Sequence, residues 1–123
     1  MNAPLGHTLP KEERLSGKNS VAALVERGKW GAVQPVRYCF SRTEGSEVNR
    51  IMVSVPKKFF KRAVRRNLLK RRLRESYRLQ KELLTVRGVD VMFVYSSKDI
   101  LGQEALYEVM TQILKDIDSR IAR

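Results

Sequence analysis

Hydrophobic residues recur along this chain with two different periods. Apolar residues three and four positions apart predict amphipathic helices over residues 19–27 and 103–117. Alternating apolar and polar residues predict strands over 36–41 and 49–55, which we expect to pair as a hairpin. Residues 89–95 are almost continuously apolar, which is typical of a strand covered on both faces.

The longest helical segment lies between these strands. Residues 57–84 contain no Gly or Pro and are rich in Arg, Lys and Leu, so they predict a long helix that begins after Pro56. The order helix, strands, helix, strand, helix predicts the α+β class. At 123 residues the chain can bury one modest core, and we expect a single domain over residues 14–120. Residues 1–13 show no periodicity and are expected to form a flexible N-terminal arm.

Positive charge is concentrated in the long helix. The chain has 25 Lys and Arg against 13 Asp and Glu, a formal net charge of +12. Between Lys57 and Lys81 there are twelve basic residues and one acid, Glu75, so this segment accounts for +11 of that charge. Such an excess repels itself in a compact protein, and a polyanion is its usual partner. We therefore expect this helix to bind nucleic acid.

The charged and apolar residues of this helix project on different sides. At about 100° per residue, one set of polar side chains falls within roughly one third of the helix circumference. These residues are Asn67, Lys70, Arg71, Arg74, Arg78 and Lys81. The residues expected to face the core are Leu69, Leu73, Tyr77 and Leu84. A solvated face, a calmodulin-target helix or a membrane-surface helix would share this charge pattern, but the last two usually have a cleaner apolar face.

The sequence lacks the patterns of a self-sufficient enzyme. The only histidine, His7, lies in the expected arm, and no Cys/His cluster has metal-ligand spacing. No Gly-rich phosphate loop is present, and the acids are scattered along the chain. The single cysteine, Cys39, lies in a predicted strand and is expected to be a buried thiol, which fits a reducing compartment. No apolar run approaches the roughly 20 residues of a membrane span, and no secretory signal is evident, so we expect a cytoplasmic protein that does not contact membranes.

The residues around the basic helix match a known family. The run Lys61–Glu75 contains Ala-Val, then Arg-Asn, then Lys-Arg and finally Arg-Glu, in a fixed order around Asn67. This run resembles the signature of the bacterial ribonuclease P protein component. Residues 9–15 and 50–58 resemble the family's N-terminal region and the strand that leads into its conserved helix. The resemblance covers almost the whole chain, residues 9–118.

The resemblance implies a fold and a function. The fold would be a two-layer sandwich similar to ribosomal protein S5 domain 2, with a left-handed βαβ crossover through the basic helix; composition alone predicts a right-handed one. The function would be that of the protein subunit of ribonuclease P, an endoribonuclease that removes the 5′ leader from precursor tRNA. In this family the catalytic RNA and its bound Mg²⁺ carry out the chemistry, so the expected partners are that RNA and precursor tRNA.

The roles of the family's residues transfer to positions of this chain. The residues that would bind the catalytic RNA are Lys57, Lys58, Arg65, Arg66, Asn67, Lys70, Arg71, Arg74 and Arg78. The cleft between the first helix and the open sheet face would hold the single-stranded leader, with Tyr38 as its aromatic residue, because base stacking tolerates any sequence. Val21 and Val25 occupy positions where the family usually has phenylalanines, and Trp30 and Phe40 are candidates to substitute for them. Leu68 stands where the family commonly has a further basic residue, for which Arg65 or Arg72 would compensate.

Two other functions stay open at this point. A ribosomal or ribosome-associated protein would also use an Arg-rich helix, although the ordered signature favours ribonuclease P. A DNA-binding module is disfavoured, because no helix-turn-helix pair leads into the basic helix, and we expect no DNA partner.

Overall fold

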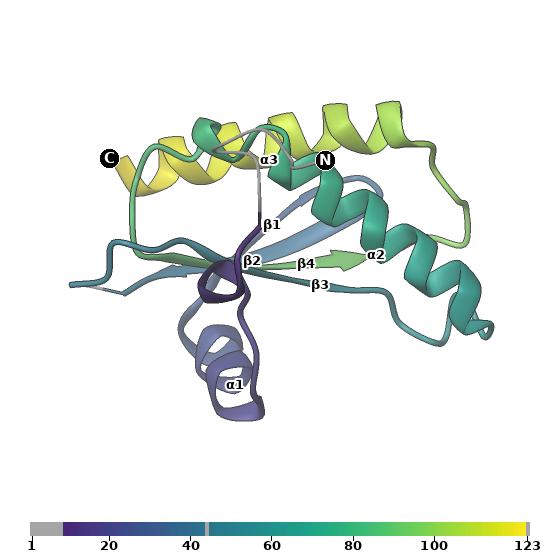
Figure 1. Cartoon of the computed structure of the whole chain (residues 1–123), viewed down its shortest axis with the longest axis horizontal. Helices are drawn as coiled ribbons and strands as arrows, with labels where there is room; N and C mark the ends of the chain where they lie inside the picture. Colours follow the sequence, from purple (N-terminus) through teal and green to yellow (C-terminus); the bar gives the residue numbers. More distant parts are fainter. Residues whose placement is uncertain (1–8, 44, 123) are drawn as a thin grey trace.

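A four-stranded sheet with helices on both faces forms the fold in the computed structural model, which describes residues 9–43 and 45–122 (Figure 1). In chain order the elements are η1 (Lys11–Glu13), α1 (Lys18–Arg27), β1 (Lys29–Val33), β2 (Val36–Arg42), β3 (Arg50–Ser54), α2 (Ala63–Arg78), η2 (Lys81–Leu83), β4 (Val89–Tyr95) and α3 (Gln103–Ala122), where η1 and η2 are single 3₁₀ turns. The predicted α+β class is confirmed. Helices α2 and α3 form one layer on the sheet, whereas α1 lies on the opposite face.

The strand order in the sheet is β1-β2-β4-β3. β1 and β2 form an antiparallel hairpin, β2 is antiparallel to β4, and β3 is parallel to β4 and joined to it through α2. The predicted hairpin between residues 36–41 and 49–55 is therefore wrong, because β4 lies between those two strands. β4 takes a central position since its residues are apolar on both faces, as its sequence predicts.

Strand β1 was not predicted from the sequence. Its residues are mostly exposed or half-buried, because β1 is an edge strand. It is held by backbone pairing with β2, from Lys29 opposite Phe40 to Val33 opposite Val36, and not by a buried apolar face. Apolar alternation, the signal used to find the other strands, is weak in such an element.

The main core lies between the sheet and the layer formed by α2 and α3. Every second residue of β2 faces this core, namely Val36, Tyr38 and Phe40. The four residues predicted to face the core from the basic segment, Leu69, Leu73, Tyr77 and Leu84, are all fully or almost fully buried. The residues that α3 contributes are Leu106, Val109, Met110, Ile113, Leu114 and Ile117, as its helical spacing predicts.

A smaller core lies on the opposite face of the sheet, under α1. It contains Leu15, Leu24, Cys39 and Met92, with Val21 packed at its edge. The Cys39 thiol is buried, its Sγ lies 3.5 Å from the backbone oxygen of Leu24, and burial raises its pKa. The prediction of a buried thiol is confirmed. Since α1 covers only this part of the face, the remainder of the sheet stays open on that side.

The basic helix is shorter than predicted. α2 begins at Ala63 and ends at Arg78, whereas the sequence predicted one helix over 57–84. The chain turns after Pro56 because Phe60 is buried and packs on Tyr95, with 6.1 Å between the ring centroids. This anchor holds residues 57–62 in a loop ahead of the helix.

Part of the predicted N-terminal arm packs on the domain. Glu13 in η1 forms an ion pair with Lys81, with 3.0 Å between Oε1 and Nζ. The amide of Leu15 donates a hydrogen bond of 2.7 Å to the backbone oxygen of Ile51 in β3. The rest of the predicted arm, residues 1–8 with His7, lies outside the described residues.

Candidate nucleic-acid interface

Three arginines of α2 are engaged inside the protein. Arg72 points toward α3 and donates a 2.6 Å hydrogen bond to the backbone oxygen of Leu101. Arg66 donates to the backbone oxygens of Phe60 and Lys61 and so fastens the loop ahead of the helix. Arg78 donates from Nε to Glu75, at 3.0 Å. Arg72 is therefore not placed to compensate for Leu68, which is itself half-buried.

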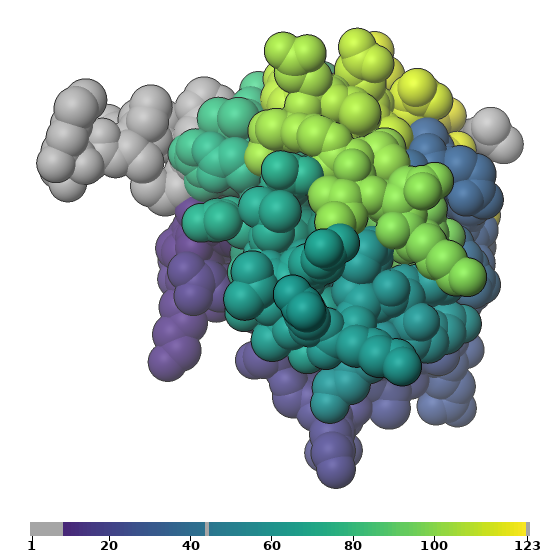
Figure 2. Space-filling model, turned by 90° about the vertical axis from the view of Figure 1, so that its right-hand side faces the viewer, coloured from purple at the N-terminus to yellow at the C-terminus, as the bar shows by residue number. Residues whose placement is uncertain are grey.

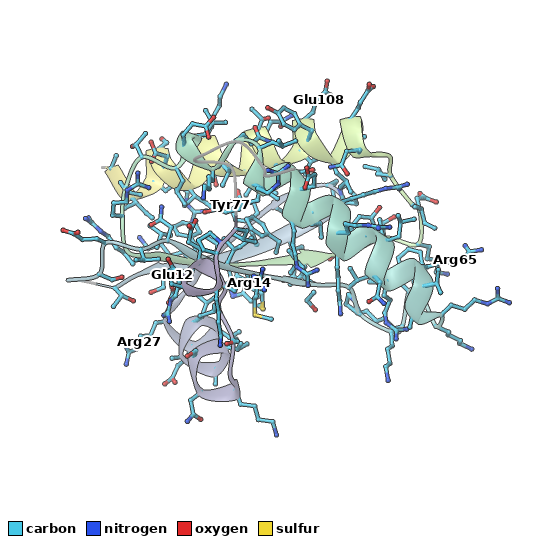
Figure 3. All side chains as sticks on the ribbon, in the orientation of Figure 1. Glu12, Arg14, Arg27, Arg65, Tyr77 and Glu108 are labelled. Carbon is cyan, nitrogen blue, oxygen red and sulfur yellow. The ribbon has the colours of Figure 1, made fainter. Side chains whose placement is uncertain are left out.

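The remaining polar residues of α2 form an outward surface that we call the basic face. It consists of Arg65, Asn67, Lys70, Arg71 and Arg74. All are exposed except Lys70, which is half-buried. In residues 9–43 and 45–122, no hydrogen bond or ion pair of the side chains engages these five residues. Figure 2 views the molecule from the N-terminal end of α2, and the helix, in teal, lies at the surface there. Figure 3 shows Arg65 extending from the same end of the helix.

The loop before α2 extends this positive surface. Lys57, Lys58, Lys61 and Arg62 are all exposed, and the Lys58 ammonium lies 5.0 Å from the ring centroid of Phe59. Helix α2 also has no side-chain cap, so its first amide groups add positive potential at the same end. Most of the predicted RNA-binding residues of the loop and the helix thus lie on adjoining surfaces; the exceptions are Arg66 and Arg78, whose guanidinium groups are engaged by the protein itself.

The only acid in this segment does not interrupt the basic face. Glu75 accepts hydrogen bonds from Arg78, which hold the pKa of its carboxyl below the usual value. Glu75 therefore keeps its negative charge but shares it with a cation of the same helix. The outward charge of the basic face is left without a nearby counterion in the described part of the chain.

The open part of the sheet, on the side of α1, carries an aromatic residue and a cation. Strand register places Trp30 and Arg37 on the same face as Cys39 and Met92. Trp30 is 39% exposed, and the Arg37 guanidinium lies 5.0 Å from its ring centroid. Arg37 is a functional candidate that the sequence analysis missed, although its alternation with Tyr38 in the strand was a usable signal.

A pocket does lie between α1 and the sheet, lined by residues such as Leu24 and Arg27 of α1 and Ser41, Arg50 and Asp90 of the strands, but Val21, Val25 and Tyr38 are not among its lining residues. Val25 is exposed and Val21 half-buried on α1. The assignment of Tyr38 to the cleft is wrong: Tyr38 is 2% exposed and its hydroxyl donates to Asp116 of α3, on the opposite face of the sheet. Phe40 is buried on that same side. The alternation in β2 correctly grouped these rings, but α2 and α3 cover their face. Trp30 is the aromatic residue available on the open face.

The burial of Tyr38 makes a prediction about alkaline stability. Burial, and then the hydrogen bond to Asp116, raise the pKa of its phenol above the ordinary value of 10. The unfolded phenol ionises near that pH while the folded one stays protonated, so the free energy of unfolding should fall as pH rises beyond about 10. Tyr38→Phe cannot ionise and should show a shallower fall, measured by urea unfolding between about pH 8 and about pH 11. Identical pH slopes for the two proteins would contradict the buried placement.

Cavities beside Arg74 connect the basic face to the open sheet face. One, of about 370 Å³, is lined by three arginines, Arg14, Arg74 and Arg78, together with Leu9 and the acid Glu75. The other, of about 290 Å³, shares Arg74, Arg14 and Leu9 and reaches Met52 of β3. Because Met52 lies on the side of α1, the two cavities carry positive charge around the edge of the sheet. One extended strand can therefore contact both surfaces.

The described residues offer little for other kinds of site. Among them, no group of three or more His, Cys, Asp or Glu is placed to hold a metal ion. Within the same part of the chain, no helix has the length and apolar character needed to cross a membrane.

Comparisons with known proteins agree with the signature in α2. A family model described as Ribonuclease P matches residues 9–118. The ribonuclease P protein component of Ralstonia pickettii is 35% identical over 126 residues, which cover 88% of this chain and 86% of that protein. The component from Porphyromonas gingivalis is 40% identical over 86 residues, 68% of this chain. In that comparison the chain spans only 63% of the relative's length.

Solved structures share the fold. The ribonuclease P protein from Thermotoga maritima superposes with a TM-score of 0.74 at 25% identity, covering 85% of this chain and 96% of that one. The protein from Staphylococcus aureus gives a TM-score of 0.75 at 20% identity, with 85% and 94% covered. With the family model matching nearly the whole chain and the ordered signature lying on an exposed basic helix, this chain belongs to the ribonuclease P protein family.

Proposed function

We propose that this chain is the protein subunit of a ribonuclease P ribonucleoprotein, which removes the 5′ leader from precursor tRNA. The observation that carries the proposal is the basic face of α2, whose cations have no partner in the described part of the chain and continue past Arg74 to the open sheet face. The family model and the relatives support this function over the ribosomal alternative.

The basic face would bind the folded RNA subunit. Its guanidinium groups can each present two parallel N–H donors to a phosphate, which a lysine cannot do. Neutralising the repulsion between Lys70, Arg71 and Arg74 and releasing counterions from the RNA both favour the complex. Lys57 and Lys58 would add contacts next to the N-terminal end of α2.

The open sheet face would bind the single-stranded leader. Trp30 offers an exposed ring on which one leader base can stack. The Arg37 guanidinium lies against that ring and would also contact a phosphate of the leader. Val21 and Val25 of α1 would supply only aliphatic contact on the other side of the cleft. Stacking of this kind does not depend on base identity, which suits leaders of varied sequence.

The chemistry would be carried by the RNA subunit. Mg²⁺ held by that RNA would activate the attacking water and stabilise the leaving oxygen. Two of the carboxylates engage residues of the chain itself: Asp90 accepts two hydrogen bonds from Arg50, and Asp118 accepts from Thr85. The protein would instead reduce the electrostatic repulsion between the RNA subunit and precursor tRNA, so that cleavage would need a lower concentration of Mg²⁺. We place this complex in the cytoplasm, which suits the unpaired Cys39.

Cleavage of precursor tRNA by the cognate RNA subunit tests the proposal. At low Mg²⁺ the protein should raise the cleavage rate, whereas at high Mg²⁺ the difference should shrink because the ions replace its screening. A precursor tRNA whose leader is at most about one nucleotide long serves as the control, because it cannot reach the open sheet face. If the protein failed to stimulate cleavage at every Mg²⁺ concentration, the proposed function would be wrong.

A further inference from the structure

A second cationic pocket lies away from the basic face. Its volume is about 320 Å³, and four cations line it: Arg27 at the end of α1, Lys29 at the start of β1, Arg42 at the end of β2 and Arg120 in the last turn of α3. Among the described residues that line it there is no carboxylate. Figure 3 shows Arg27 on the opposite side of the molecule from Arg65, and the C-terminal end of α3 lies on that same side in Figure 1.

Two of these cations are held in position by the fold. Arg120 donates from Nη1 to the backbone oxygen of Trp30 at 3.3 Å and to Asp116 at 3.4 Å, and its guanidinium lies 4.9 Å from the ring centroid of Phe40. Arg42 donates from Nε to the backbone oxygen of Arg87 at 3.2 Å. Within the described residues, Nη2 of each of these two arginines has no hydrogen-bond partner. Both guanidinium groups therefore keep N–H donors for a ligand.

The other two cations are exposed. No hydrogen bond or ion pair engages the side chains of Arg27 and Lys29 in residues 9–43 and 45–122. Four cations around one pocket repel one another, and an anion that enters it removes that cost. The three guanidinium groups and one ammonium of the pocket can all donate hydrogen bonds to the oxygens of a phosphate group.

The pocket has nothing with which to recognise a base. Phe40 is 3% exposed and lies under Arg120, so its ring is not available for stacking. Of the lining residues that the structure describes, Ser41 is the one uncharged polar residue. A phosphodiester contact that ignores sequence fits this chemistry better than a nucleotide-specific one.

We propose that this pocket binds a backbone phosphate of RNA and gives the protein a second RNA contact, separate from the basic face. This inference rests on the proposed function, because it assumes an RNA-bound protein. The strand could belong to the ribonuclease P RNA or to precursor tRNA, and both present the same phosphodiester. The protein would then hold RNA at two ends of the molecule.

A double variant tests this site. Arg27→Gln with Lys29→Gln removes the two cations that no described side-chain contact engages, and Lys98→Gln with Lys115→Gln removes the same charge from exposed positions outside the pocket. Binding is measured as a function of salt in two arms: each protein with the ribonuclease P RNA, and each reconstituted holoenzyme with precursor tRNA. In one arm, the pocket variant should bind on the order of threefold to tenfold more weakly, with a salt slope smaller by about 0.7 to 0.9 per lost phosphate contact.

The arm that shows the loss identifies which RNA supplies the phosphate. If the pocket variant and the control variant keep the same affinity and salt slope in both arms, or lose them equally, the pocket does not bind RNA. Arg71→Ala, tested alongside, separates this result from a failure of the proposed function. If the wild-type protein binds the RNA and Arg71→Ala binds it more weakly, the proposed function stands whatever the pocket variant does. Thermal unfolding of both double variants checks that they are folded.

Discussion

Replacing Lys70, Arg71 and Arg74 with alanine is expected to weaken binding to the ribonuclease P RNA by about 10²-fold to 10³-fold. Each side chain lies on the basic face without a partner in the described part of the chain, so its loss costs RNA contacts and not folding contacts. A charge-assisted contact contributes about 1–1.5 kcal/mol, or roughly fivefold to tenfold in affinity. Three lost phosphate contacts should also reduce the salt slope by about 2.7. Filter binding at several salt concentrations gives both quantities.

The adjacent arginine provides a matched control. Arg72 is the same residue type one position along the helix, but its guanidinium donates to the backbone oxygen of Leu101. Arg72→Ala should lower the free energy of unfolding by about 1–2 kcal/mol and leave the salt slope of RNA binding unchanged. If Arg72→Ala flattened the salt slope as much as Arg71→Ala, the RNA would not be bound by the exposed side of α2.

Replacing Trp30 with alanine is expected to weaken binding of precursor tRNA to the holoenzyme by about fivefold to 150-fold. The estimate follows from the loss of one base–aromatic stack, worth about 1–3 kcal/mol. The affinity for mature tRNA should not change, because it has no leader to stack on the open sheet face. Equilibrium binding of the two tRNAs to the same holoenzyme measures the ratio directly.

Two further variants delimit the role of Trp30. Trp30→Phe should keep most of the preference for precursor tRNA, since a ring remains on the open face. Tyr38→Phe should keep all of it, because the Tyr38 ring is buried against α3 and its hydroxyl interacts with Asp116 and Arg120 of that helix, not with the open face. An equal loss for precursor and mature tRNA in Trp30→Ala would show that the ring supports the fold or the RNA subunit, and not the leader.

The position of Arg74 explains why the two surfaces can act together. Arg74 lies at the end of the basic face and lines both cavities, the second of which reaches Met52 on the α1 side of the sheet. Arg14, from the segment that pairs with β3, lines the same cavities. If the basic face binds RNA as proposed, a strand that leaves it would pass Arg74 and Arg14, with Glu75 beside them, before it reaches the sheet.

Local periodicity was sufficient for several elements. The helical spacing of apolar residues identified the buried side of α2 and of α3, and the apolar run of residues 89–95 identified β4 as a strand covered on both faces. These features depend only on which side chains lie near one another within a single element. The concentration of charge between Lys57 and Lys81 and the ordered signature were likewise readable from the sequence.

Contacts between distant residues decided the rest. The sequence grouped Val36, Tyr38 and Phe40 on one face of a strand but could not show which face α2 and α3 would cover; Tyr38 contacts Asp116, 78 positions away. Helical periodicity placed Arg71, and not Arg72, on the polar side of the helix, but only the position of Leu101, 29 residues after Arg72, gives Arg72 its structural contact. The pocket formed by α1, β1, β2 and α3 has no sequence signal at all, because its four cations come from four elements. Periodicity within the chain determined the elements and their buried sides, whereas the order of the strands and the packing of the helices determined which polar residues face a partner.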